Sequence, residues 1–250
     1  MLPFRRILFP VDYSEPCRAV VPYAQDMLNH FSAELTLVHA YGPATVVALA
    51  RNQHELTDPN FPEQVHAIEK QRLHDFALQV FPGQRAELIT ETGEPGSIIH
   101  KVAQQQQADL IMLSTHGYGP VRRLLLGSVT AKVLHDATTV IWTGIRSSLT
   151  DPMPAIPYRS IVCALDDTSE AEAVLQGAAA LASSYGAQLS LLHVIQTPVT
   201  PRVDYGPYKT ELTDAAYNRL RELQSILGVD APAAVIDAPI SDGVRDEALR

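Results

Sequence analysis

The first half of the chain alternates short apolar runs with longer segments whose apolar residues recur at helical spacing. The runs have the length of buried strands, and they lie at Ile7–Val11, Leu35–His39, Glu87–Thr90, Leu110–Leu113 and Val140–Trp142. Helical spacing marks Ala19–Phe31, Val65–Val80 and a segment that opens at Gly96, whereas Tyr41–Pro62 has no clear period. Strands that alternate with helices predict right-handed βαβ units. We therefore expect an α/β fold, an open parallel-sheet, Rossmann-like sandwich with helices on both faces.

The opening of this pattern occurs a second time further along the chain. When the sequence is shifted by 154 residues, Phe4–Ala40 lies on Tyr158–Val194 without a gap, and ten of the 37 pairs are identical. One of the identical pairs is His39 with His193. So many identities, with apolar positions matched elsewhere, predict a tandem repeat of two similar units.

A proline-rich stretch separates the two units. Ser147–Pro157 contains three prolines, which neither continue a helix nor enter the interior of a sheet. We expect a linker at 147–157, between a first unit at 1–146 and a second unit at 158–250.

The second unit repeats the first only in part. Its expected elements are strand Ile161–Leu165, helix Ala171–Tyr185, strand Leu189–Val194, helix Thr213–Leu227, strand Ala234–Ile236 and a helix beginning at Ser241. The part of the first unit at Asp109–Ile145 has no counterpart in the second. We expect an incomplete second unit, either truncated or degenerate, whose exposed sheet edge needs covering.

Composition narrows the class of protein. The 250 residues are 46% hydrophobic and 19% charged, which suits one or two globular domains. Nineteen basic against 28 acidic residues give a net charge of -9, which disfavours a nucleic-acid surface. The apolar runs are far shorter than the ~20 residues that span a bilayer, and two cysteines exclude a disulfide framework or zinc cluster. We expect a cytoplasmic protein with no nucleic-acid or membrane partner.

The segment Leu113–Thr130 carries the residues of greatest chemical interest. It follows a buried strand, and ligands of open α/β sheets bind beyond the carboxyl ends of the strands. Gly117 and Gly119 allow the backbone to approach a ligand closely. Ser128, which follows Gly127, is suited to cap the next helix, and a helix N-terminus attracts phosphate.

Two common phosphate-binding motifs do not fit this segment. The P-loop pattern Gly-x-x-x-x-Gly-Lys-Ser/Thr does not occur. A dinucleotide fingerprint that began at Gly117 would need glycine or alanine where Arg122 stands. Nicotinamide chemistry is therefore disfavoured.

The spacing of the segment resembles that of the universal stress proteins, whose nucleotide-binding members carry Gly-x-x-Gly, nine residues, and then Gly-Ser/Thr. Here Gly117 is followed by nine residues and then by Gly127 and Ser128, and Ser114 stands at the first glycine of the pattern. The resemblance extends to Phe9–Glu15 and Leu37–Ala40.

The resemblance implies an adenine nucleotide alpha hydrolase-like fold and a site for ATP, with or without Mg²⁺. The residues that it assigns to the nucleotide are Pro10, Asp12, Ala40, Leu113, Ser114, Gly117, Gly127, Ser128, Val129 and Thr130. Pro10 and Ala40 would border adenine, and Asp12 would lie near the base or ribose. Residues 127–130 would hold the phosphates. The second unit has Ala164 in place of Pro10 and lacks the glycine loop, so we expect no independent site there.

Structural interpretations of the same residues remain open. Asp12 or Ser14 is suited to cap the first helix, and the glycines could serve as turn residues. His116 has no nucleophile or paired carboxylate in an identifiable motif, and no His-Glu-x-x-His occurs. We therefore expect neither a metal site nor a classical enzyme.

Three functions follow from these alternatives. The first is an ATP-binding module in stress response or signalling. The second is a dimeric scaffold of the same fold that binds no nucleotide, and the third is an enzyme that uses His116 or Asp12 on an adenylated substrate. Members of the resembled family commonly pair through the last strand of the unit, here Thr139–Thr143, so the resemblance implies a homodimer through Val140–Trp142.

Overall fold

The computed structural model describes residues 3–50, 53–115, 127–136, 138–144, 156–197 and 206–248. The chain divides into two compact units, residues 3–154 and 155–250, which carry separate sheets. Within the described ranges, no helix is long and apolar enough to cross a membrane.

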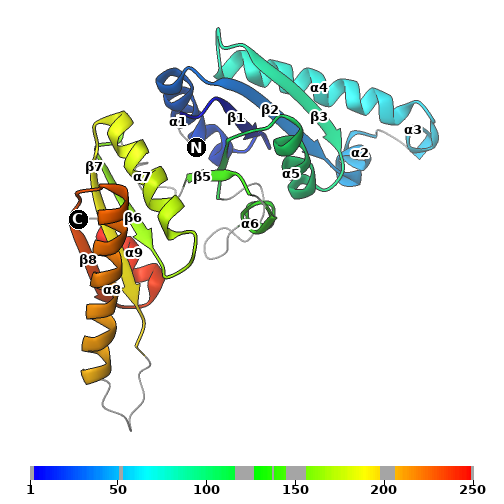
Figure 1. Cartoon of the computed structure of the whole chain (residues 1–250). Coiled ribbons are helices and arrows are strands. Elements are labelled where there is room, and N and C mark those ends of the chain that lie inside the picture. The colour runs from blue at the N-terminus through cyan, green and yellow to red at the C-terminus, as the bar shows by residue number, and fades with distance from the viewer. Residues whose placement is uncertain are drawn as a thin grey trace. The chain divides into compact units, whose positions relative to one another are not determined.

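The first unit contains a five-stranded sheet (Figure 1). Its strands are β1 (Arg6–Pro10), β2 (Glu34–Tyr41), β3 (Ala86–Thr92), β4 (Leu110–Ser114) and β5 (Val140–Gly144). They lie in the order β3-β2-β1-β4-β5, and every pair is parallel. The expected parallel α/β architecture is confirmed, with each strand at its expected place to within a few residues.

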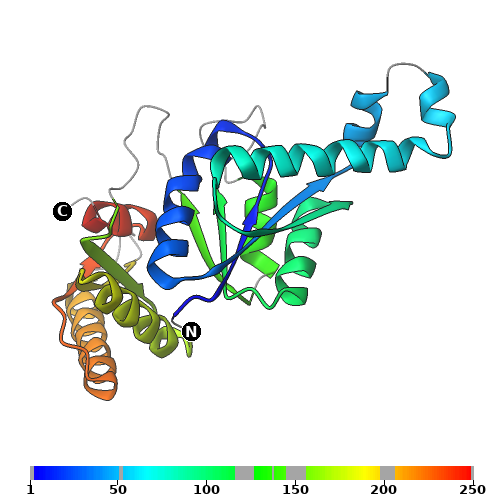
Figure 2. The same ribbon diagram turned by 90° about the horizontal axis from the view of Figure 1, so that it is seen from above.

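Helices cover both faces of this sheet (Figure 2). They are α1 (Glu15–Phe31), α4 (Phe61–Val80), α5 (Pro95–Gln105) and α6 (Ser128–Asp136). Leu8, Val38 and Ile111 form a core with Ile99 and Val102 of α5. On the other face, Phe9 meets Phe81 edge to face, with their ring centroids 5.5 Å apart. Successive residues of a strand point to opposite faces of the sheet. Because both faces are covered by helices, almost every residue of a strand is apolar.

Two short helices lie where the sequence shows no period. They are α2 (Pro43–Leu49) and α3 (Gln53–Thr57), and both contact α4. Gly42 and Pro43 form the start of α2, where a proline is tolerated because the first N–H of a helix has no partner within it. No residue of α2 is fully buried, so its sequence carries no strong apolar stripe. Because α2 lacks an amphipathic period, the hydrophobic pattern of the sequence did not predict this helix.

The second unit carries a three-stranded parallel sheet in the order β6-β7-β8. Its elements are β6 (Ser160–Leu165), α7 (Ala171–Tyr185), β7 (Gln188–Ile195), α8 (Gly206–Leu227), β8 (Ala233–Asp237) and α9 (Ile240–Ala248). Leu175, Leu191, Leu220 and Leu223 are buried together in its core. In the described part of this unit, β6 pairs only with β7, whereas its counterpart β1 lies between β2 and β4.

Candidate functional site

The strand order places a switch point at the carboxyl ends of β1 and β4. From β1 the chain adds β2 and β3 on one side, and it then returns to add β4 and β5 on the other side. Connections that diverge from neighbouring strands leave a crevice at their carboxyl ends, and ligands of open α/β sheets bind there. Pro10 ends β1 and Ser114 ends β4, so two of the residues singled out in the sequence lie at this point.

Apolar residues from three elements pack on one core beside the switch point. Leu113 on β4 is buried in the core on the α5 side of the sheet. Ala40 on β2 and Val129 on α6 are partly buried and pack against the same core. Three of the residues that the resemblance assigned to the nucleotide therefore belong to this core or border it. Their surfaces are of a kind that suits one face of a flat aromatic base.

The described ends of the glycine loop are tied together. The Gly127 N–H donates to the Thr115 carbonyl at 2.9 Å, and the Thr130 hydroxyl donates to the Ser114 carbonyl at 2.9 Å. The Thr115 hydroxyl donates in turn to the Gly144 carbonyl on β5 at 3.1 Å. These bonds fix the start of α6 against the ends of β4 and β5.

The middle of the loop, residues 116–126, lies outside the described residues. Sequence predictions for His116, Gly117, Gly119, Arg122 and Arg123 therefore remain predictions.

The first turn of α6 has the character of an anion site. The helix begins at Ser128, so Gly127 occupies the preceding cap position that the sequence had given to Ser128. The N–H groups of a first helical turn have no partner within the helix, and the helix dipole adds partial positive charge there. Ser128 is exposed, whereas Thr130 is buried and its hydroxyl is engaged with Ser114. Because this hydroxyl is already engaged, the backbone N–H is the group through which Thr130 can donate to an anion.

The turn between β1 and α1 divides its two polar residues between two tasks. The Ser14 hydroxyl accepts a hydrogen bond from the Cys17 N–H at 3.1 Å and caps α1. One oxygen of Asp12 accepts from the Ser14 N–H at 2.9 Å, which shapes the turn. The capping role thus belongs to Ser14. The half-buried Asp12 lies directly after the end of β1, at the switch point.

Tyr13, between these two residues, has a left-handed backbone with φ of 62°. For a residue with a side chain this conformation costs roughly 1–2 kcal/mol, so the surroundings must hold it. The Tyr13 ring lies 5.5 Å from Phe76 and 4.6 Å from His39, measured between ring centroids. The Arg72 guanidinium carbon lies 4.1 Å from the ring centroid. Such a cation–π contact contributes about 0.5–2 kcal/mol, comparable with the cost of the backbone.

A buried carboxylate stands behind Tyr13. Glu69 on α4 is 1% exposed, and its Oε2 lies 3.2 Å from His39 Nε2, an ion-pair distance without hydrogen-bond geometry. The other ring nitrogen, Nδ1, lies 2.7 Å from the Val11 carbonyl, and it must donate because a carbonyl only accepts. Arg72 Nη1 lies 3.7 Å from Glu69 Oε1. We call Tyr13, His39, Glu69 and Arg72 the Tyr13 cluster.

The sequence pattern identified His39 only as a position repeated in the second unit, and it did not reveal the rest of the Tyr13 cluster. One signal was present. Val65, Glu69, Leu73 and Phe76 share the buried stripe of α4, so a charged residue occupies a core position. Because a buried charge is costly unless it is paired, this pattern predicts a partner for Glu69.

The family model described as "Universal stress protein family" matches residues 3–142 and 157–248, which is most of the chain and both units. The chain belongs to the universal stress protein family. The resemblance noted in the sequence is confirmed, as is the tandem of two related units.

Individual relatives agree with this assignment. A Thermus aquaticus protein described as "Universal stress protein in QAH/OAS sulfhydrylase 3'region" is 32% identical over 138 residues, which cover 54% of this chain and 93% of that protein. A putative universal stress protein of Staphylococcus haemolyticus is 29% identical over 140 residues, 55% of this chain and 82% of that protein.

Solved structures share the fold of the whole chain. A universal stress protein from Archaeoglobus fulgidus has a TM-score of 0.64 at 18% identity, covering 98% of this chain and 83% of its own. A putative universal stress protein from Pseudomonas aeruginosa has a TM-score of 0.62 at 15% identity, covering 99% of this chain and 79% of its own.

The second universal stress protein unit lacks the features of the first site. Ala164 stands where the first unit has Pro10. The Asp166 carboxylate accepts from the Thr168 hydroxyl at 2.6 Å and from the Thr168 N–H at 3.1 Å. These bonds lower the pKa of Asp166 and commit the carboxylate to its own turn. No described element of this unit corresponds to the loop that precedes α6.

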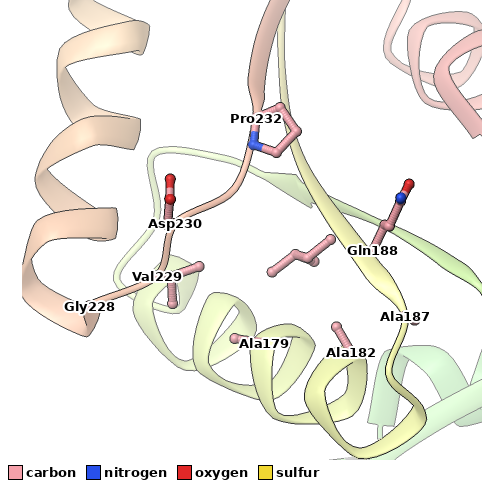
Figure 3. A pocket seen from close by; sticks show the side chains of 9 residues that line it. Ala179, Ala182, Ala187, Gln188, Gly228, Val229, Asp230 and Pro232 are labelled. Carbon is pink, nitrogen blue, oxygen red and sulfur yellow. The ribbon is translucent and has the colours of Figure 1, made fainter.

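A hollow of ≈ 670 Å³ does occur in the second unit (Figure 3). Its lining includes Ala182 of α7, Gln188 at the start of β7 and Gly228 after α8. Ala182 stands where the shift of 154 residues places the buried Leu28, so a smaller side chain contributes to the space. The hollow lies at the amino ends of the strands, away from the ends where ligands of this fold bind. We therefore do not assign the site to it.

Side chains suited to metal binding are not clustered in the described part of the chain. No group of three or more His, Cys, Asp or Glu residues there is arranged to hold a metal ion. Any divalent cation at this site would have to take most of its oxygen ligands from bound phosphates and water, as Mg²⁺ commonly does.

Proposed function

We propose that the first unit binds ATP at the carboxyl ends of β1 and β4, and that binding serves a cytoplasmic stress-response or signalling role. The observation that carries the proposal is the junction of Ser114 and Thr115 with Gly127 and Thr130 at the switch point. It brings the start of a helix to the position where this sheet favours a ligand. The family membership of the chain and the spacing from Gly117 to Ser128 support the same ligand.

The residues divide among the parts of the nucleotide. Pro10, Ala40 and Leu113 supply apolar surface for adenine. Asp12 supplies a carboxylate that accepts hydrogen bonds from a ribose hydroxyl or the adenine amine.

The phosphates fall to the start of α6 and to the loop before it. The N–H groups of Ser128, Val129 and Thr130 and the Ser128 hydroxyl donate to phosphate oxygens, and Gly117 permits close backbone approach. Mg²⁺, where it accompanies ATP, screens the phosphate charge from the acidic chain.

The proposed function is the binding of ATP, and catalytic turnover of ATP is not part of it. Among the described residues assigned to the site, Asp12 is the one ionisable side chain, and it already accepts a hydrogen bond within its turn. General acid–base catalysis needs a group placed to take a proton from the attacking atom. A switch in conformation or partner choice on ATP binding requires no such group.

We also propose that two chains pair through β5. In the described sheet, β5 is an edge strand that pairs only with β4, and Val140 on it is exposed. An unpaired strand edge is a template for a second strand. Ile141, by contrast, packs against the core of its own unit.

A scaffold that binds no nucleotide is the second candidate. Ser114 favours it, because a side chain stands where the pattern of the nucleotide-binding members has glycine. The two candidates differ in one measurable property, the affinity for ATP.

Calorimetric titration of the nucleotide-stripped chain with ATP and Mg²⁺ tests the proposal. We expect saturable binding that is lost in Gly117→Val and weakened in Asp12→Asn. Asp166→Asn is the matched control, because it makes the same change at the equivalent position of the second unit. Absence of binding by the stripped wild-type chain would favour the scaffold. Equal weakening by the two Asp→Asn changes would contradict the location of the site.

A further inference from the structure

The Tyr13 cluster lies behind the Asp12 turn and contains none of the residues assigned to the nucleotide. Two of its members, Glu69 and Arg72, come from α4, and His39 comes from β2. A buried carboxylate within ion-pair distance of a histidine, a cation–π contact and a left-handed tyrosine backbone thus meet in one place. Strained backbone held by its surroundings is concentrated at functional sites.

The cluster holds the turn on both sides of Asp12. On one side, His39 Nδ1 donates to the carbonyl of Val11, the residue before Asp12. On the other side, the ring of Tyr13, the residue after Asp12, is held against His39 and under the Arg72 guanidinium. Glu69 lies within ion-pair distance of both His39 and Arg72, so one buried carboxylate supports both attachments.

We propose that Glu69, Arg72, His39 and Tyr13 are positioning residues, which fix the backbone of the Asp12 turn in the form that accepts the nucleotide. The inference rests on the proposed nucleotide site and deepens it. Helix α4 thereby sets the affinity of a site to which it contributes none of the assigned residues. If the turn populates other conformations when the cluster is broken, the apparent dissociation constant rises in inverse proportion to the fraction of chains that remain competent.

The second unit shows what the same framework looks like without the cluster. The buried Leu73 and Leu220 align α4 with α8, and this alignment puts Ala216 where Glu69 stands. The histidine is kept as His193, which is also buried.

In the second unit the acid that approaches the histidine comes from the turn itself. Asp167 replaces Tyr13, and its Oδ2 lies 3.9 Å from His193 Nε2. Asp167 is 74% exposed and is not among the described non-glycine residues with positive φ. The histidine therefore does not require the strained turn. The strained turn occurs in the unit that carries the candidate site.

The two units suggest a decisive set of variants of the full chain. Glu69→Ala removes the buried carboxylate, as in the second unit. The double variant Tyr13→Asp with Glu69→Ala copies the second unit at both positions and returns an acid to His39 without the tyrosine. Glu63→Ala is the matched control, since it removes an exposed acid from the same helix.

Cys17 provides a readout that does not depend on ATP. It is 3% exposed, and its N–H bonds to Ser14 in the turn. Burial raises the pKa of the Cys17 thiol to about 12, with the Asp12 charge adding to the effect. A thiol reagent therefore modifies Cys17 slowly unless the turn opens. A Cys163→Ser background leaves Cys17 as the single cysteine of the chain.

We expect Glu69→Ala to weaken ATP binding at least about tenfold and to speed the labelling of Cys17 by a similar factor. Glu63→Ala should change neither by more than about twofold. The double variant should keep weak ATP binding and fast labelling, because it returns an acid to His39 but does not restore the Tyr13 ring. All variants are measured well below their thermal midpoints, where the chain is folded, which separates positioning from general stabilisation.

Two results would overturn the inference. One is wild-type affinity and labelling in Glu69→Ala. The other is wild-type affinity and slow labelling in the double variant. Should Glu69→Ala not fold, Glu69→Gln, which keeps the volume but removes the charge, is measured in the same way. If the wild-type chain binds no ATP, the proposed function fails, and the labelling of Cys17 alone decides whether the cluster holds the turn.

Discussion

The Thr130 hydroxyl provides a quantitative test of how the ends of the glycine loop are held. Thr130→Val replaces the hydroxyl by a methyl group of similar size, so it opens no cavity. Thr130 is 4% exposed, and its hydroxyl donates to the Ser114 carbonyl at 2.9 Å. Water cannot easily take the place of the lost donor at a buried position. We therefore expect a loss in the free energy of unfolding of about 1–3 kcal/mol, the range for a broken buried hydrogen bond.

Urea unfolding followed by tryptophan fluorescence measures this loss in the first unit. Trp142 is the only tryptophan of the chain, and it lies on β5 with its ring centroid 5.1 Å from that of Tyr23. Its emission therefore reports the unit that contains Thr130. The midpoint shift at constant slope gives the change in free energy. Because 1.4 kcal/mol corresponds to a tenfold change in a dissociation constant, a loss of this size can weaken ATP binding by at most about 5- to 150-fold.

Thr138→Val is the matched control, because Thr138 is exposed and lies just before β5. Its effect should stay within about 0.5 kcal/mol, as for most surface substitutions. A free energy of unfolding of Thr130→Val within about 0.3 kcal/mol of the wild-type value would contradict this role of the hydroxyl. An equal loss in Thr138→Val would contradict it as well.

Three further outcomes are expected. Phe81→Ala should cost the first unit about 3–5 kcal/mol, because the 2% exposed Phe81 packs edge to face on Phe9; an unchanged Trp142 transition would contradict this packing. Val140→Lys should convert a dimer to monomers in size-exclusion chromatography with light scattering, and a dimer that persists would exclude β5 as the interface. The Thr197 hydroxyl and Lys209 hold the pKa of Asp237 at about 2, below its ordinary value of 3.8. This stabilisation is present above the unfolded value and is lost as pH falls through the folded value. Asp237→Asn should therefore lower the thermal midpoint of the second unit at pH 7, and the difference from the wild type should shrink as pH falls from about 4 to about 2; a difference that does not change with pH would argue against the ion pair.

The sheet could be predicted from the sequence because its strands are nearly continuous apolar runs. A strand that is buried on both faces can be recognised from its own residues, without knowledge of its neighbours. Leu110–Leu113 is an example. The repeat and the spacing from Gly117 to Ser128 gave the family. Helices α2 and α3 escaped because they bury little of their own surface.

The Tyr13 cluster could not be predicted, for a different reason. Its members come from three segments that lie tens of residues apart, and they meet only because α4 packs on the sheet with Glu69 opposite His39. The φ of Tyr13 is set by that packing and not by any local preference for a left-handed turn. Likewise, the choice of Ser14 over Asp12 as the cap of α1 depends on the geometry of the turn.

Amide NMR of the nucleotide-stripped, isotope-labelled chain tests the central claim most directly, because it reports which backbone N–H groups meet the phosphates. The account predicts that ATP with Mg²⁺ shifts the amides of Ser128, Val129 and Thr130, while adenosine shifts those near Asp12 and Ala40 and leaves the start of α6 in place. Shifts confined to the second unit, or none at saturating ATP, would contradict a nucleotide site at the carboxyl ends of β1 and β4.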